Sequence, residues 1–272
     1  MLGHAAASVL SDGFDVIASV RNRKRAAHYG IPADLVSFDA YTGDIGALLD
    51  EVRPDAVLNA IGLVKQLPAG QSPASAIRLN ALFPHLLAEA CAATGARLVH
   101  VSTDCVFSGT LAAPARYTED HVPEAADVYG RSKLLGEVDA PALTLRTSII
   151  GRELERASGL LEWFVTSDQP RVNGFTKAIF SGVTTIELAH FVGRALREHR
   201  ELAGLWHLAA DPIDKFDLLQ RLRNVLGIER EIVAVDEPVI NRALDASRLA
   251  EATGYRPPDW DTMLAEYGTS HG

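Results

Sequence analysis

Short, nearly uncharged apolar runs alternate with longer helical stretches over residues 1–150 of this 272-residue chain. The alternation is typical of repeated βα units, whose strands pair side by side in a parallel sheet. Most runs are four to six residues long, as expected of strands that are buried on both faces. The predicted strands are residues 15–20, 35–38, 56–61, 98–102 and 143–145. The sequence therefore predicts an α/β fold with a doubly wound parallel sheet.

Helical periodicity fills the spaces between these strands and loosens after residue 147. We expect helices at residues 42–52, 75–93 and 129–138, and Pro84 should kink or split the second of them. Further helices are expected at residues 160–166, 185–199 and 260–267. We predict a dinucleotide-binding domain at 1–147 and a smaller substrate-binding lobe at 148–272, with the helix at 185–199 able to pack on the first domain.

Composition and charge exclude several classes of protein. The net charge of −9 disfavours binding to nucleic acid or to anionic membranes. Cys91 and Cys105 are too few for a disulfide scaffold, and no Cys/His spacing matches a metal site. No apolar run approaches the roughly 20 residues of a membrane-spanning helix. We therefore expect a cytoplasmic protein with free thiols, without a metal and without a membrane partner.

The sharpest local motif is Tyr129-Gly130-Arg131-Ser132-Lys133, which follows Ser102-Thr103 by about 26 residues. Tyr and Lys four positions apart share one face of a helix, so the ammonium group can favour the anionic phenol. The alternative is an ordinary surface helix, since such a pair arises by chance about 0.1 times in a chain of this composition. We favour a hydride-transfer site in which Tyr129 is the general acid, Lys133 lowers its pKa and Thr103 orients a carbonyl.

Two longer strings extend this motif into a family resemblance. VSTDCVFSG (101–109) and VYGRSKLLGE (128–137) resemble the active-site signatures of extended short-chain dehydrogenases/reductases, especially the dTDP-4-dehydrorhamnose reductase family. The tail RALDASRLAEATGYRPPDW (242–260) resembles that family's C-terminal segment, and residues 172–185 resemble its branch of UDP-deoxysugar 4-ketoreductases. The resemblance implies a Rossmann fold and assigns catalysis to Thr103, Tyr129 and Lys133.

The family binds its nicotinamide cofactor through a Gly-x-x-Gly-x-x-Gly loop between its first strand and first helix. Here Met1-Leu2-Gly3-His4 matches only the end of that loop, with Gly3 as the third glycine. We therefore expect the first strand of the sheet and two glycines to be missing from this chain.

Other cofactor contacts implied by the resemblance are present. Arg21 and Arg23 follow a predicted strand where an acidic residue would bind the ribose of NAD, so they favour the 2′-phosphate of NADP, with NAD as the alternative. The run could also be a solvated loop. Asp39, Asn59, Ala60 and Gly62 are further predicted cofactor residues, and Asn80 is expected to face the catalytic helix; each of these could equally be a cap or turn residue. Lys133 is also expected to bond the nicotinamide ribose.

The resemblance implies NADPH-dependent reduction of the C4 ketone of a nucleotide-linked 4-keto-6-deoxyhexose. One alternative is an epimerase or 4,6-dehydratase, although such dehydratases typically show Asp-Glu after the catalytic Thr, where this chain has Asp104-Cys105. Another is a non-catalytic member, because the regulatory subunit of methionine adenosyltransferase resembles the same family. The expected partner is a nucleotide-sugar substrate, and assembly as a homodimer is left open.

Overall fold

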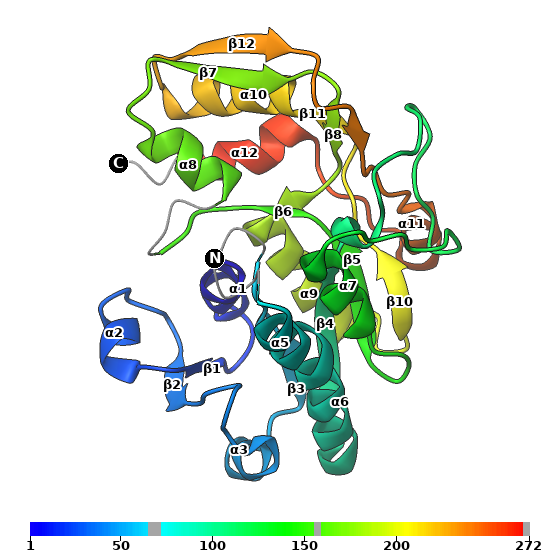
Figure 1. Cartoon of the computed structure of the whole chain (residues 1–272). Helices are drawn as coiled ribbons and strands as arrows, with labels where there is room; N and C mark the ends of the chain where they lie inside the picture. The colour runs from blue at the N-terminus through cyan, green and yellow to red at the C-terminus, as the bar shows by residue number, and fades with distance from the viewer. Residues whose placement is uncertain (65–71, 155–158, 269–272) are drawn as a thin grey trace.

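The computed structural model describes residues 1–64, 72–154 and 159–268 (Figure 1). Its main sheet has four parallel strands in the order β10-β5-β4-β3, and a separate parallel pair is formed by β1 and β2. The five predicted strands are confirmed as β1 to β5, and β10 is a further strand that was not predicted. The strands are β1 (Ile17–Val20), β2 (Asp34–Ser37), β3 (Ala56–Asn59), β4 (Arg97–Thr103), β5 (Leu143–Thr147) and β10 (Gly204–His207).

The two sheets are separated at a defined place. Within the described residues, β1 pairs only with β2, and β3 pairs only with β4. The strand order is therefore β2-β1, a break, and then β3-β4-β5-β10, and the break lies where a doubly wound sheet has its first strand. Helix α1 (Leu2–Leu10) begins beside this break, since a Cβ on Gly3 would lie 3.9 Å from the Cβ of Ala60.

The helices that pack on the sheet begin or end at other residues than predicted, because capping residues or a proline set their ends. The expected helix at 75–93 is divided into α5 (Pro73–Ala76), a π-helical turn η1 (Ile77–Leu82) and α6 (Phe83–Thr94), with Pro84 in the first turn of α6. Helix α3 (Ile45–Val52) begins after Asp44, whose Oδ1 accepts a hydrogen bond from Ala47 N at 3.0 Å. Helix α7 (Val128–Leu135) ends before the predicted boundary, at Gly136.

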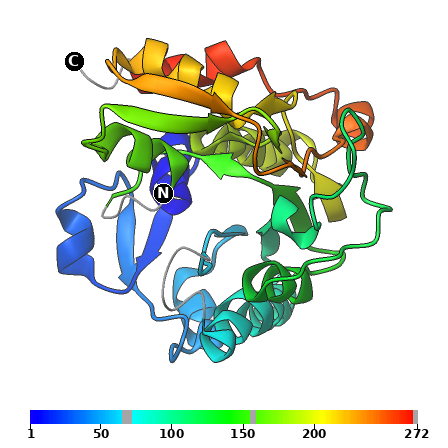
Figure 2. The same cartoon turned by 45° about the horizontal axis from the view of Figure 1, so that its top comes forward.

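The C-terminal half forms a layered lobe over one end of the main sheet (Figures 1 and 2). Strands β7 and β12 pair in parallel and contact helix α10. Strand β8 lies between β11, antiparallel to it, and β13, parallel to it. The elements are β6 (Ile149–Ile150), α8 (Leu160–Thr166), β7 (Arg171–Phe175), β8 (Ala178–Phe180), β9 (Val183–Thr184), α9 (Thr185–Glu198), β11 (Ile213–Asp214), α10 (Lys215–Leu226), β12 (Glu231–Val235), β13 (Ile240–Asn241), α11 (Ser247–Thr253) and α12 (Trp260–Gly268).

The two halves share one hydrophobic core. Its buried residues include Val99 and Leu143 of the main sheet and Leu188 and Leu218 of α9 and α10. Helix α9 also packs against α1. The division at residue 147 stays a prediction. No helix within the described ranges is long and apolar enough to cross a membrane.

Candidate active site

Thr103 ends β4 and begins the turn that carries the first signature. Its Oγ1 accepts a hydrogen bond from Cys105 N at 3.2 Å and donates one to Asp104 Oδ1, also at 3.2 Å. These bonds cap the 3₁₀ turn η2 (Asp104–Val106) and leave the Thr103 side chain 6% exposed. The hydroxyl is therefore held at the carboxyl end of a central strand, where open α/β sheets bind their ligands.

Helix α7 brings Tyr129 to this threonine. Asp127 caps the helix by accepting a hydrogen bond from Gly130 N at 2.7 Å. A Cβ on Gly130 would lie 2.3 Å from the carbonyl oxygen of Cys105, so only glycine lets the helix come this close to η2. The Tyr129 phenol is hydrogen-bonded to the Thr103 side chain. The structure thus unites the predicted acid with the predicted orienting residue.

The direction of the Tyr129 pKa differs from the sequence-based expectation. Burial raises the pKa of the phenol, the neighbouring Cys105, Asp104 and Asp127 add to the rise, and the hydrogen bond with Thr103 opposes it. The expected lowering by Lys133 is not what this structure shows: burial is the largest cause of the shift, and Lys133 is not among the leading causes. The phenol is protonated at neutral pH, as a proton donor must be, although the rise in pKa by itself makes it a weaker acid.

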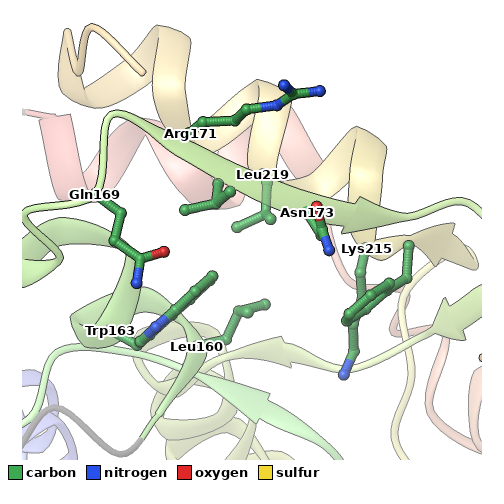
Figure 3. A pocket seen from close by; sticks show the side chains of 9 residues that line it. Leu160, Trp163, Gln169, Arg171, Asn173, Lys215 and Leu219 are labelled. Atoms are coloured by element: carbon green, nitrogen blue, oxygen red, sulfur yellow. The ribbon is translucent and has the colours of Figure 1, made fainter. Parts of the chain in front are cut away.

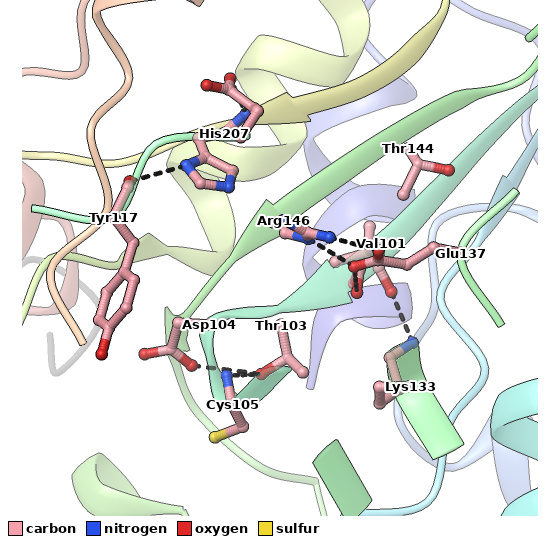
Figure 4. A network of polar contacts seen from close by, with 12 residues as sticks. Val101, Thr103, Asp104, Cys105, Tyr117, Lys133, Glu137, Thr144, Arg146 and His207 are labelled. Atoms are coloured by element: carbon pink, nitrogen blue, oxygen red, sulfur yellow. Dashed lines mark hydrogen bonds and ion pairs between the residues drawn. The ribbon is translucent and has the colours of Figure 1, made fainter. Parts of the chain in front are cut away.

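Lys133 lies one helical turn after Tyr129 and is 5% exposed. Its Nζ donates a hydrogen bond to the carbonyl oxygen of Val101 at 2.7 Å (Figure 4). Burial lowers the pKa of Lys133 to about 8, and the Glu137 carboxylate opposes this effect. The ammonium group is therefore poised to lose its proton just above neutral pH.

This buried amine predicts a pH-dependent stability. Between its folded pKa of about 8 and its unfolded value of 10.5, Lys133 binds more protons in the unfolded state, so the free energy of unfolding rises with pH in that window. The full rise is of order 3 kcal/mol. We expect Lys133→Met to be more stable than the unaltered chain at pH 7, with a difference that shrinks as pH rises from 8 to 10. Urea unfolding of both proteins across this range measures the difference, and a constant difference contradicts the prediction.

The loop after β3 contains three of the predicted cofactor residues. Asn59 is 2% exposed; its Oδ1 accepts from Ile61 N at 3.1 Å and its Nδ2 donates to His100 Nδ1 at 3.0 Å. Its side chain therefore shapes the loop from inside, while Ala60 is partly exposed and Gly62 is exposed.

Asn80 joins the same loop to the catalytic helix. Its side chain accepts from Leu63 N at 2.7 Å and donates to Leu63 O at 2.9 Å and to Ser132 Oγ at 3.1 Å. Asn80 itself lies in the π-helical turn and is completely buried. It therefore faces α7, as the resemblance implies, and couples the loop to the helix that carries Tyr129.

The other predicted cofactor residues lie at helix starts and strand ends. Gly3 lies in the first turn of α1, whose N-terminus has no side-chain cap. Arg21 follows β1 and Arg23 opens α2 (Arg23–Ala27), so the basic run is mainly a short helix capped by Asn22 and not a loop. Asp39 follows β2, and its Oδ1 accepts from Tyr41 N at 2.8 Å.

A cavity of about 370 Å³ lies in the C-terminal lobe and was not predicted (Figure 3). It is bounded by α8, β7 and α10, and two cationic and two amide side chains line it beside an indole ring. Residues distant in sequence form it, so no local motif could reveal it. Its lining includes Trp163, Gln169, Arg171, Asn173 and Lys215.

Comparison with known proteins agrees with this geometry. The family model described as the RmlD substrate binding domain matches residues 6–270. The dTDP-4-dehydrorhamnose reductase of Aggregatibacter actinomycetemcomitans is 25% identical over 247 residues, which are 80% of this chain and 82% of that protein. The corresponding protein of Burkholderia thailandensis is 28% identical over 255 residues, covering 79% and 82%.

Solved structures share the fold across different reactions. A dTDP-4-dehydrorhamnose reductase of Bacillus anthracis in complex with NADP has a TM-score of 0.77 at 20% identity, covering 94% of this chain and 99% of that one. The UDP-glucose 4-epimerase of Thermotoga maritima with UDP-glucose also has a TM-score of 0.77, at 15% identity, covering 99% and 94%. The fold alone therefore does not separate reductase from epimerase.

Proposed function

This chain belongs to the family of the RmlD substrate binding domain, and on that premise we propose that it catalyses NADPH-dependent reduction of the C4 ketone of a nucleotide-linked 4-keto-6-deoxyhexose. One observation carries the proposal: the Tyr129 phenol is hydrogen-bonded to Thr103, one helical turn from the buried Lys133. A protonated phenol beside an orienting hydroxyl is the arrangement that carbonyl reduction requires.

The residues that would hold the cofactor fit it. The N-terminus of α1 has no side-chain cap, so its backbone N–H groups suit a pyrophosphate, and a Cβ on Gly3 would meet only the side chain of Ala60, at 3.9 Å. Arg21 and Arg23 are exposed at the end of β1, where they suit a 2′-phosphate. Asp39 and the loop at Ala60–Gly62 would border the rest of the dinucleotide. NADPH supplies the hydride when bound.

The chain's own residues supply the proton. The Thr103 hydroxyl can donate a hydrogen bond to the ketone oxygen and so orient the carbonyl. As the C4 oxygen gains negative charge, the O–H bond of Tyr129 breaks and its proton moves to that oxygen. The phenolate left behind is stabilised by the ammonium charge of Lys133.

The cavity in the C-terminal lobe suits the nucleotide part of the substrate. Lys215 brings a cation that suits a phosphate group, whereas the Arg171 guanidinium points away from the cavity and pairs with Glu231 at 3.7 Å. The Trp163 ring offers a stacking surface for a base, and the amides of Gln169 and Asn173 can hydrogen-bond to its polar atoms.

The cytoplasmic location and a homodimer stay predictions.

The function is tested by mixing the purified chain with NADPH and a dTDP- or UDP-linked 4-keto-6-deoxyhexose. We expect the NADPH absorbance to fall only when the chain and the 4-keto sugar are both present. Mass spectrometry should then show a sugar product that has gained two hydrogens. NADPH binding without oxidation, with both nucleotide series, would contradict the proposal and favour a non-catalytic role.

Cofactor preference gives a further prediction. We expect the double variant Arg21→Glu/Arg23→Glu to weaken NADPH binding by about tenfold or more while NADH binding stays within about threefold. Fluorescence titration with each cofactor measures this split. Arg256→Glu reverses one arginine at another exposed position and should leave both affinities unchanged. Equal weakening of both cofactors in the double variant would argue against a 2′-phosphate contact.

A further inference from the structure

A second buried charge lies just beyond Lys133. Glu137 follows the C-terminal end of α7, and its side chain is 12% exposed. Its carboxylate accepts hydrogen bonds from Arg146 Nε and Nη2, both at 2.7 Å, and from Ser102 Oγ at 2.7 Å. Figure 4 shows this bridge beside the hydrogen bond between Lys133 and Val101. The carboxylate has no role in the mechanism derived above.

Two strands fix this carboxylate. Arg146 lies on β5, is 4% exposed on its side chain, and grips both carboxylate oxygens. Its guanidinium group lies over the Phe107 ring, 5.3 Å from the centroid. Ser102 precedes Thr103 on β4. Glu137 is thereby tied to the strands that lie beneath Thr103 and Lys133.

The cluster contains two buried cations and one buried anion. An arginine keeps its proton, so Arg146 is always charged. Like charges repel strongly where water is excluded, and a buried cation without a counter-ion tends to lose its proton. Glu137 and Lys133 are held at adjacent residues of β4, the carboxylate by Ser102 Oγ and the ammonium group by the carbonyl oxygen of Val101, both at 2.7 Å, and the Glu137 charge raises the pKa of Lys133.

Two further carboxylates lie at His207 on β10: Glu119 Oε1 accepts a hydrogen bond from His207 N at 2.8 Å, and the charge of Asp245 raises the His207 pKa; neither is a cause of the Lys133 shift. Burial and the charge of Lys133 lower the pKa of His100 on β4, and His85 on α6 adds to that effect. Burial and the charge of Arg146 lower the pKa of His207 on β10 to about 3. Both buried imidazoles are neutral at neutral pH, and so is the Tyr129 phenol.

We propose that Glu137, anchored by Arg146 and Ser102, is a positioning residue that serves as the counter-ion of Lys133 and keeps its ammonium group charged beside Tyr129. The role in the reaction rests on the proposed function. The charge state of Lys133, by contrast, can be measured whether or not the chain is a reductase.

Lysine NMR tests the counter-ion directly, because the chain contains only five lysines. With ¹³C-labelled lysine, the signal lost in Lys133→Met identifies Lys133, and in the unaltered protein it should titrate near pH 8. In Glu137→Gln we expect this midpoint to fall by about one pH unit or more. Because Lys133 must be protonated to stabilise the phenolate, the alkaline limb of kcat/KM should fall by the same amount.

Further variants separate charge from folding. Glu137→Gln leaves Arg146 buried without its anion, so the double variant Glu137→Leu/Arg146→Met provides a version in which both charges are replaced by apolar groups. It should unfold cooperatively, and its Lys133 titration midpoint should fall less than in Glu137→Gln, because the repelling charge of Arg146 is removed as well. Glu137→Asp keeps the charge and should keep the midpoint nearer to that of the unaltered protein. Glu198→Gln removes a glutamate from a surface pair with Arg194 and should change nothing.

The possible outcomes distinguish failure of the counter-ion assignment from failure of the proposed function. An unchanged Lys133 midpoint in folded Glu137→Gln overturns the counter-ion assignment. A lowered midpoint with an unmoved alkaline limb of kcat/KM overturns the role in the reaction. A lowered midpoint in a chain that reduces no 4-keto sugar supports the counter-ion and overturns the proposed function.

Discussion

Replacing Tyr129 by phenylalanine is expected to lower kcat by about 10²–10⁴-fold, while the affinity for NADPH stays within about twofold. The phenol is the proton donor, and its hydrogen bond with Thr103 keeps it aimed at the carbonyl position. Phenylalanine retains the ring and its packing but has no proton to give. Steady-state kinetics with the 4-keto substrate and fluorescence titration with NADPH measure the two effects separately.

Tyr267→Phe is the matched control for this substitution. It removes one buried tyrosine hydroxyl, which donates to the carbonyl oxygen of Ile150 at 3.0 Å, at a position outside the proposed site. Its kcat should stay close to that of the unaltered chain. Equal losses in both variants would mean that the effect of Tyr129→Phe comes from packing, and turnover that survives in Tyr129→Phe would reject its role as the acid.

Gly136→Ala is expected to lower the free energy of unfolding by about 3 kcal/mol. A Cβ at this position would lie 1.8 Å from the backbone oxygen of Asn80 and 2.9 Å from its carbonyl carbon. Because the obstacle is backbone, it cannot swing aside, and α7 must move away from the π-helical turn. That movement also disturbs the Asn80 bonds to Leu63 and Ser132, so kcat should fall together with stability.

Urea unfolding of Gly136→Ala should show a lower midpoint with an unchanged slope. Gly46→Ala is the control, because Gly46 is exposed in α3 and its added Cβ would lie 3.4 Å from Asp44 Oδ1. Alanine there should stabilise the chain by about 0.5–1 kcal/mol through helix propensity. A stability of Gly136→Ala within about 0.5 kcal/mol of the unaltered chain would show that α7 can shift freely.

The sequence predicted the elements whose signal is local. Period, charge and length placed β1 to β5, although β10 of the main sheet was not predicted, and the spacing of Tyr129 and Lys133 on one helix identified the pair that lies near Thr103. Asn22 carried a readable capping signal, yet the basic run after it was weighed as a loop. Helix α7 was predicted to continue to residue 138 because Gly136 was not considered as its C-terminal cap, and it ends at Leu135.

What the sequence could not predict depends on contacts between distant segments. The rise in the pKa of Tyr129 follows from burial by neighbouring elements, which a Tyr-x-x-x-Lys pattern does not express. Gly130 and Gly136 are needed because two other backbones come close to α7. The Glu137–Arg146 bridge joins the end of a helix to a separate strand, so neither residue predicts the other.

The break between β1 and β3 also bears on how this chain behaves in concentrated solution. Each of these strands turns one row of backbone N–H and C=O groups toward no other strand of the described chain, and open edges of this kind are templates for intermolecular β-pairing and aggregation. Ile17 of β1 is 47% exposed, which adds an apolar contact for an incoming strand. The basic run from Arg21 to Arg25 follows β1 directly and places like charges where a second molecule would have to align. These cations therefore oppose intermolecular β-pairing by charge repulsion, and they are also candidates for phosphate binding.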